Sequence, residues 1–208
     1  MISRKYNFIF QHIPKCAGIS VLNFFIKLHH IEECIGDLMY DPHNTFSFYK
    51  LKFPEYYENC FKFTFVRNPW DRVVSLYEFR KQEANKGTHR KTWPTIPELL
   101  NDSFEDTIKK SARNTNPEIL YLEPAYTDNY WMPKEILKET NFIGRFEDIV
   151  RDFDYIKYVL DIDPDYQLTH DNQIKRKHYS EYYNDETRKI VAEKYATDIQ
   201  LFGYKFEN

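Results

Sequence analysis

The sequence predicts an α/β protein with a central parallel sheet flanked by helices in three layers. Two stretches of the chain carry this prediction, because each has a short aromatic and β-branched run, then a tight loop, then a helical pattern. The runs are residues 6–11 (YNFIFQ) and residues 61–66 (FKFTFV). Repeated strand–loop–helix order is typical of parallel sheets, whose loops meet at the sheet edge where ligands usually bind.

The first repeat continues through residues 12–18 (HIPKCAG), which contain Pro and Gly and are predicted to form a loop. A helix is predicted over residues 19–30, because Val21, Leu22, Phe25 and Ile26 fall on one helical face. Residues 37–45 are predicted to be irregular, and residues 48–58 to form another helix.

The second repeat continues through residues 67–71 (RNPWD), a predicted turn because Pro69 cannot continue a strand ladder. Asp71 is predicted to cap a helix over residues 72–83. Residues 84–117 are polar and are interpreted as a surface insertion with one helix near residues 96–110. Residues 118–133 are crowded with aromatic side chains, and residues 84–133 together are expected to lie on the acceptor side of the site.

The remaining chain carries a third predicted strand over residues 141–144, followed by a helix over residues 148–160. Residues 175–178 (KRKH) form a basic run. A helix is predicted over residues 185–202, ended by Gly203 as a C-cap. No repeat is visible, and 208 residues are expected to form a single domain.

The composition of the chain argues against several classes of protein function. The chain has 29 Lys plus Arg against 32 Asp plus Glu, so no general nucleic-acid coating is expected and any anion site must be local. The three cysteines, Cys16, Cys34 and Cys60, are interpreted as reduced thiols of a cytoplasmic protein. No apolar run is long enough for a signal peptide or membrane segment, which leaves only peripheral membrane association open. No cluster has the spacing of a metal site.

The first loop has the chemistry of an anion site. Small residues at Ala17 and Gly18 allow close backbone approach, the opening N–H groups of the next helix lack intrahelical partners, and Lys15 adds a positive charge. Ser20 adds a hydroxyl. The loop is not a Walker sequence, because the Lys precedes the Gly. A strand-to-helix turn with an incidental Lys remains the alternative.

The second loop offers Arg67 directly after a strand and Ser75 in the next helix. Arg can bind a phosphate with both arms of its fork, and Ser75 can add a hydroxyl to the same group. Taken alone, each residue also fits a solvated surface position. Two such loops at one sheet edge predict a ligand with two separated anionic ends.

These motifs resemble those of sulfotransferases that use 3′-phosphoadenosine-5′-phosphosulfate (PAPS), which have a P-loop-like fold. HIPKCAGIS is similar to their HIPKTAGTS-type loop, and FTFVRNPWDRVVSLY to their 3′-phosphate loop. FIGRFEDIVRDF and the C-terminal YYNDETRKIVAEKYATDIQLFGYKF resemble carbohydrate sulfotransferases, particularly compact bacterial members.

The resemblance implies that Lys15 and the backbone amides of the loop hold the 5′-phosphosulfate; the loop residues are Cys16, Ala17, Gly18, Ile19 and Ser20. It implies that Arg67 and Ser75 hold the 3′-phosphate. Lys175, in the basic run, is expected to close over the nucleotide or to reach an anionic acceptor, with a solvated basic turn as the alternative. Cys16 and Ile19 replace the family's usual Thr residues, so two hydroxyl contacts are lost and weaker cofactor binding is expected.

The implied reaction needs a general base, and His43 is the candidate because related glycan sulfotransferases place a catalytic His between the first helix and the second strand. His12 is expected to orient the first loop. An aromatic group, Tyr121, Tyr126, Tyr130 and Trp131, is interpreted either as a sugar-stacking wall or as lid packing.

The resulting hypothesis is a bacterial cytoplasmic enzyme that transfers the sulfuryl group of PAPS, without a metal, to a carbohydrate hydroxyl in polysaccharide or glycolipid biosynthesis. Two alternatives remain: a P-loop-like kinase that uses ATP, and a catalytically inactive nucleotide-binding module.

Overall fold

The structure is a computed structural model that describes residues 1–32, 36, 38–39, 44–85, 101–113, 134–169 and 174–207. The chain forms two compact units. The first unit comprises residues 1–67 and 125–173, and the second comprises residues 68–124 and 174–208. The single domain expected over residues 1–208 stays a prediction.

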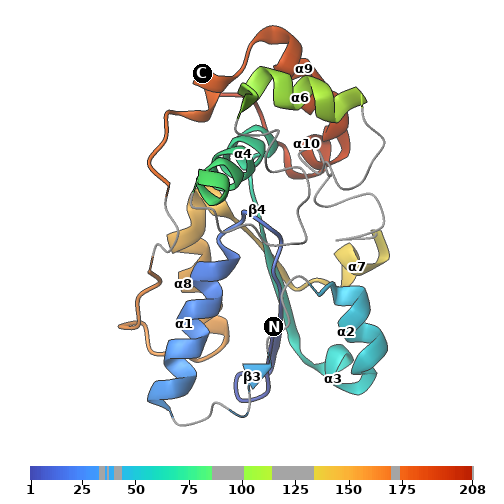
Figure 1. The fold of residues 1–208 in the computed structure, drawn as a ribbon. Helices are drawn as coiled ribbons and strands as arrows, with labels where there is room; N and C mark the ends of the chain where they lie inside the picture. Colours follow the sequence, from blue (N-terminus) through green and yellow to red (C-terminus); the bar gives the residue numbers. More distant parts are fainter. Residues whose placement is uncertain are drawn as a thin grey trace. The chain divides into compact units, whose positions relative to one another are not determined.

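The first unit is built on a sheet with the strand order β3-β1-β2-β4-β5 (Figure 1). β2 (Phe8–Gln11), β4 (Phe61–Val66) and β5 (Phe142–Arg145) are parallel to one another, which confirms the predicted parallel core. The sheet is nevertheless mixed, because β1 (Ile2–Ser3) pairs antiparallel with both β2 and β3 (Leu38–Met39). These two-residue strands are too short to show an alternating pattern.

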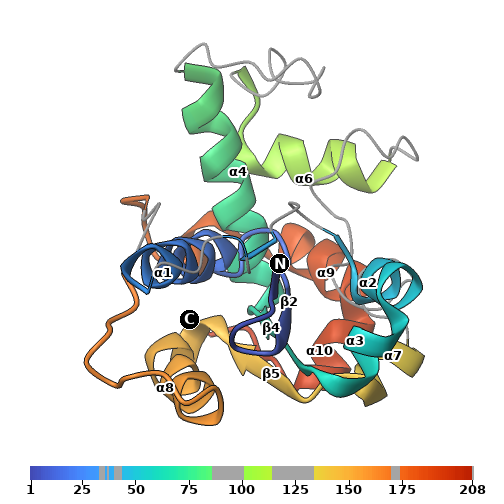
Figure 2. The same ribbon diagram turned by 90° about the horizontal axis from the view of Figure 1, so that it is seen from below.

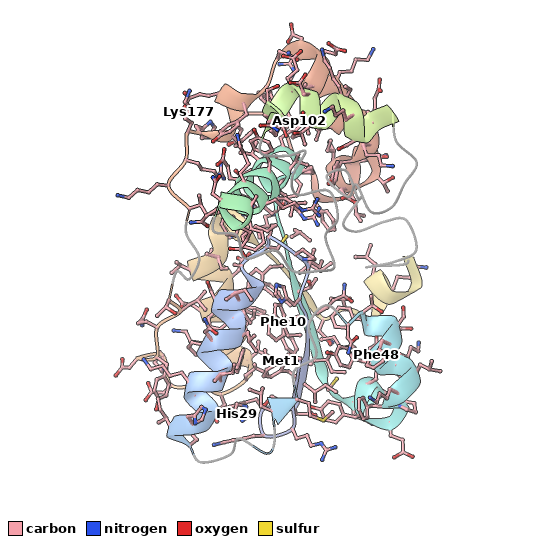
Figure 3. The ribbon with its side chains drawn as sticks, in the orientation of Figure 1. Met1, Phe10, His29, Phe48, Asp102 and Lys177 are labelled. Atoms are coloured by element: carbon pink, nitrogen blue, oxygen red, sulfur yellow. The ribbon has the colours of Figure 1, made fainter. Side chains whose placement is uncertain are left out.

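One face of the sheet is covered by α1 (Gly18–Ile31) and α8 (Ile149–Val159), which lie on the same side of the strands in Figures 1 and 2. Phe8 of β2 packs on Phe25 of α1, with ring centroids 4.4 Å apart. Phe24 of α1 packs edge-on against Phe153 of α8 at 4.8 Å. Phe10 follows on the same face, because successive strand side chains alternate, and it lies in the interior (Figure 3).

The other face is covered by α2 (Phe46–Lys52) and α3 (Pro54–Asn59). Ile9, which points away from Phe8, belongs to a buried cluster with Phe46 and Tyr57. The helix predicted over residues 48–58 is therefore two short helices. Pro54 explains the break, because proline disfavours helical backbone in the residue before it and fits the first turn of a new helix. α7 (Lys134–Glu139) and the short 3-10 helix η2 (Phe146–Asp148) complete the described elements of this unit.

The second unit is helical and contains α4 (Pro69–Asn85), α6 (Phe104–Arg113), the 3-10 helix η3 (Tyr179–Tyr182), α9 (Asp185–Lys194) and α10 (Ala196–Phe202). Its core joins α4, α6 and α9 through Val74, Ile108 and Val191, each at most 1% exposed. Within the described residues, no helix is long and apolar enough to cross a membrane.

Two predictions in the second unit are wrong in detail. Asp71 does not cap the helix, because α4 already begins at Pro69 and the Asn68 side chain accepts the Trp70 N–H at 3.1 Å. Proline suits this first helical position. The helix predicted over residues 185–202 breaks at Tyr195, which is 1% exposed in the core, while Gly203 ends α10 with the predicted left-handed C-cap (φ 67°).

The predicted insertion is described only in part. α6 overlaps the helix expected near residues 96–110. Residues 86–100 and 114–133, with the aromatic group at Tyr121, Tyr126, Tyr130 and Trp131, lie outside the described residues.

Cys60 is expected to react slowly with thiol reagents. The thiol is 4% exposed, and burial raises its pKa to about 11. Since only the thiolate is nucleophilic, alkylation of native protein at pH 8 should be about 100-fold slower at Cys60 than in the urea-unfolded chain. Because the folded pKa lies above the unfolded one, this group should also cost stability as the pH rises from about 9 to about 11. Peptide mapping after timed labelling measures the rate, and equal labelling rates in native and unfolded protein would contradict the prediction.

Candidate functional site

The loop between β2 and α1 has an unusual backbone. Lys15 and Ala17 both have left-handed conformations, with φ of 66° and 60°. Pro14 has a negative φ by its ring, and Cys16 is not among the residues with positive φ, so the sign of φ alternates from residue 14 to residue 17. Alternation of this kind is typical of a nest, a backbone arrangement whose successive N–H groups turn toward one side and can bind an anion. Of these N–H groups, that of Cys16 donates to the Ile13 carbonyl at 3.3 Å.

The amides at the start of α1 are not capped by the side chain of the residue before the helix. The residue before the helix is Ala17, which has no side chain that can cap it. The N–H groups of Ala17, Gly18 and Ile19 donate to no acceptor among the described residues, and the first bond of the helix runs from Val21 N to Ala17 O at 3.2 Å. By contrast, α2 and α9 are capped by Thr45 and Asn184. Uncapped amides at the positive end of a 14-residue helix favour an anion.

Gly18 is required by close packing. A Cβ added there would overlap the His12 ring, which is 5% exposed and stacks on Phe10 with an interplanar angle of 13°. His12 therefore packs against the start of α1, and its role in orienting the loop stays a prediction.

The loop is joined to the end of β4 by Arg67. The Arg67 Nη1 donates to the Lys15 carbonyl at 2.9 Å, so the structure brings together the two cations that the sequence singled out. Arg67 is 6% exposed, whereas Lys15 is half-buried. The guanidinium also stacks on Phe146, 3.7 Å from the ring centroid.

The remaining loop side chains differ in exposure. Cys16 is 1% exposed, and its thiol donates to the Pro14 carbonyl at 3.7 Å. Ser20 is buried in the first turn of α1, and Ile19 is half-buried. The thiol of Cys16 therefore points into the protein. The polar groups of residues 16–19 that can contact a ligand are those of the backbone.

The second unit brings the other predicted residues to one end of α4. Arg176, inside the basic run, forms an ion pair with Asp71 in the first turn of α4. Ser75 lies four residues after Asp71 and so shares its helix face. Ser75 is half-buried, and Lys175, next to Arg176, is exposed. The ion pair therefore holds Arg176, the neighbour of Lys175 in the chain, at the first turn of α4, four residues before Ser75.

The segment after the basic run is also fastened to α4. Tyr183 Oη donates to the Trp70 carbonyl at 2.9 Å, and Tyr182 Oη donates to Glu78 at 2.9 Å. Burial, aided by Glu78, raises the pKa of Tyr182 to about 12, so this hydroxyl remains a donor at neutral pH.

The Asp71–Arg176 ion pair is expected to stabilise the second unit. Both side chains are mostly buried (14% and 16% exposed), so a double-mutant cycle with Asp71→Ala and Arg176→Ala should give a coupling of about 1 kcal/mol in urea unfolding. The exposed pair Lys189–Glu193, at 78% and 68%, is the control and should give almost none. Equal coupling in the two cycles would contradict the prediction.

Two findings complete the site. His43 lies outside the described residues, so its role as base stays a prediction. Phe146 was not singled out from the sequence, although its position directly after β5 in GRFED places it at the same sheet edge as Arg67. Among the described residues, no three His, Cys, Asp or Glu side chains form a group that could hold a metal ion.

The fold is that of an α/β protein whose first parallel strand is followed by a loop of alternating φ and then a helix without a side-chain cap. The chain belongs to the sulfotransferase family, since a family model with the description "Sulfotransferase family" matches residues 1–205. No curated protein and no solved structure matches the chain.

Proposed function

We propose that the protein is a PAPS-dependent sulfotransferase that transfers a sulfuryl group to a carbohydrate hydroxyl. The observation that carries the proposal is the loop after β2, where uncapped amides, a nest and Lys15 occur together in a chain of the sulfotransferase family. The 5′-phosphosulfate of PAPS is an anion of the size and charge that such a nest accepts. The family match does not favour the alternatives of a kinase or an inactive module.

The resemblance of the two loops supports an assignment of residues to the two ends of the nucleotide. Lys15 and the amides of residues 16–20 would hold the 5′-phosphosulfate. Arg67 and Ser75 would hold the 3′-phosphate, and Lys175 would close over the nucleotide. Cys16 and Ile19 supply no hydroxyl, so cofactor affinity would depend on backbone amides, which survive such side-chain changes.

The chemistry is an in-line displacement at sulfur. The acceptor oxygen forms a bond to sulfur while the bond from sulfur to the bridging phosphate oxygen breaks, and 3′-phosphoadenosine-5′-phosphate (PAP) leaves with the electron pair. Catalysis of this kind depends on positioning and on stabilisation of the charge that develops on the leaving oxygen. Lys15 would supply that stabilisation, and the acceptor proton would pass to a general base.

His43 is the proposed base, because imidazole is neutral and can accept a proton near pH 7. His43→Ala is expected to lower kcat about 100-fold with little change in the KM for PAPS. His30→Ala, which removes an exposed His from α1, is the matched control and should keep kcat. A His43→Ala enzyme with wild-type kcat would overturn the assignment.

Calorimetry with PAP and with ATP tests the nucleotide. We expect PAP to bind at least tenfold more tightly than ATP, and tighter binding of ATP would favour the kinase. Sulfate transfer from labelled PAPS then separates an active enzyme from an inactive binding module.

The acceptor is proposed to be a glycan or a glycolipid precursor in bacterial polysaccharide synthesis, and the enzyme to be cytoplasmic. A panel of oligosaccharides and lipid-linked sugars, offered with labelled PAPS, tests this directly. Transfer to simple phenols but to no sugar would reject the carbohydrate acceptor while leaving the sulfotransferase proposal standing.

A further inference from the structure

Two of the contacts that Arg67 makes within the first unit differ in their chemistry. Its Nη1 donates to the Lys15 carbonyl at 2.9 Å, and its guanidinium carbon lies 3.7 Å from the centroid of the Phe146 ring. Arg67 follows β4, Phe146 follows the neighbouring strand β5, and Lys15 lies in the loop after β2. The three residues therefore connect the carboxyl ends of three parallel strands.

The bond from Arg67 fixes the backbone of the loop at Lys15, a residue with a left-handed conformation. Arg67 satisfies this carbonyl with a charged donor, which gives a stronger bond than a neutral one. Loss of that bond would leave a carbonyl of a strained, left-handed residue without its charged donor.

Phe146 restricts the guanidinium that makes this bond. A separation of 3.7 Å is well inside the range of about 6 Å over which a cation and an aromatic face attract. The ring covers one face of the planar guanidinium and so limits the rotations that would carry Nη1 away from Lys15. Phe146 is half-buried. Among the described residues, its ring is linked to the loop through its contact with Arg67.

We propose that Phe146 is a positioning residue for the anion-binding loop. By stacking on Arg67 it holds the guanidinium on the Lys15 carbonyl, and this keeps residues 14–18 in the nest conformation before any ligand binds. The inference rests on the proposed function only for the identity of the anion.

A fluorination series separates this role from simple packing. Phe146 is replaced by mono-, di- and trifluorophenylalanine, which keep the shape of the ring but progressively weaken its attraction for a cation. Two quantities are measured: hydrogen exchange in the ligand-free protein of the Cys16 and Val21 amides, which donate to the Ile13 and Ala17 carbonyls, and the Kd for PAP. We expect both the exchange rates and the Kd to rise stepwise, by about tenfold in total.

Matched variants complete the design. The same series at Phe142, which is in β5 and packs on the Tyr155 ring at 4.8 Å, should leave exchange of the Cys16 and Val21 amides unchanged. Phe146→Tyr should behave as wild type, and Phe146→Leu should match or exceed the trifluoro variant.

The outcomes are distinct. Exchange rates and a Kd for PAP that stay constant across the Phe146 series would overturn the inference. This holds even if Phe146→Leu lowers the Tm, because a lower Tm without the other two changes would mean that Phe146 contributes only packing. If the wild-type protein does not bind PAP, the proposed function fails, while the exchange series still decides the role of Phe146.

Discussion

Lys15→Ala is expected to lower kcat for sulfuryl transfer by about 100- to 1,000-fold, the loss seen when one group that stabilises a developing charge is removed. The side chain is half-buried beside the uncapped start of α1, so its charge would act with little screening on the bridging oxygen. The Kd for PAP should change much less than kcat, because the amides of residues 16–20 remain. Single-turnover transfer from labelled PAPS, with calorimetry of PAP in parallel, measures the two effects.

The controls for this prediction come from the same region. Lys15→Arg keeps a charge but places it differently, and it should recover only part of the rate. Lys27→Ala removes an exposed Lys from α1 and should leave kcat unchanged. A Lys15→Ala enzyme that binds PAP poorly but transfers at the wild-type rate would show that Lys15 serves binding alone.

Gly18→Ala is expected to destabilise the protein by about 3 kcal/mol and to abolish measurable binding of PAP. The added methyl group would overlap the His12 ring, which is buried and stacked on Phe10, so the ring cannot move without disturbing the sheet. The start of α1 would have to shift instead, and the amides of the nest would shift with it.

A double-mutant cycle tests the cause of the Gly18 effect. His12→Ala in the Gly18→Ala background removes the ring that the new methyl group meets, so the two changes together should cost less than the sum of the single changes by at least 1 kcal/mol. Gly36→Ala is the control, because no described atom lies within 4 Å of the position of its Cβ. Additive costs at Gly18 and His12 would show that the destabilisation has another origin.

The local patterns predicted the elements that place the loops. β4 was predicted at residues 61–66, as observed, because FKFTFV is a short aromatic run bounded by a Pro three residues later. α1, β5 and the Gly203 cap were predicted for similar reasons, since periodicity and capping preferences act within a few residues. The helices predicted over residues 48–58 and 185–202 are each broken in the structure. The first break, at Phe53, depends on Pro54, which the prediction did not take into account. The second, at Tyr195, coincides with a side chain buried in the helical core.

The residue types of the loops and the order of strands and helices along the chain follow from the sequence itself, because neighbouring residues determine them. The left-handed conformations of Lys15 and Ala17, the fit of Gly18 under His12, and the stacking of Arg67 on Phe146 do not. The Arg67–Phe146 contact joins residues 79 positions apart (146 − 67), and only the pairing of β4 with β5 brings those two side chains to one edge of the sheet.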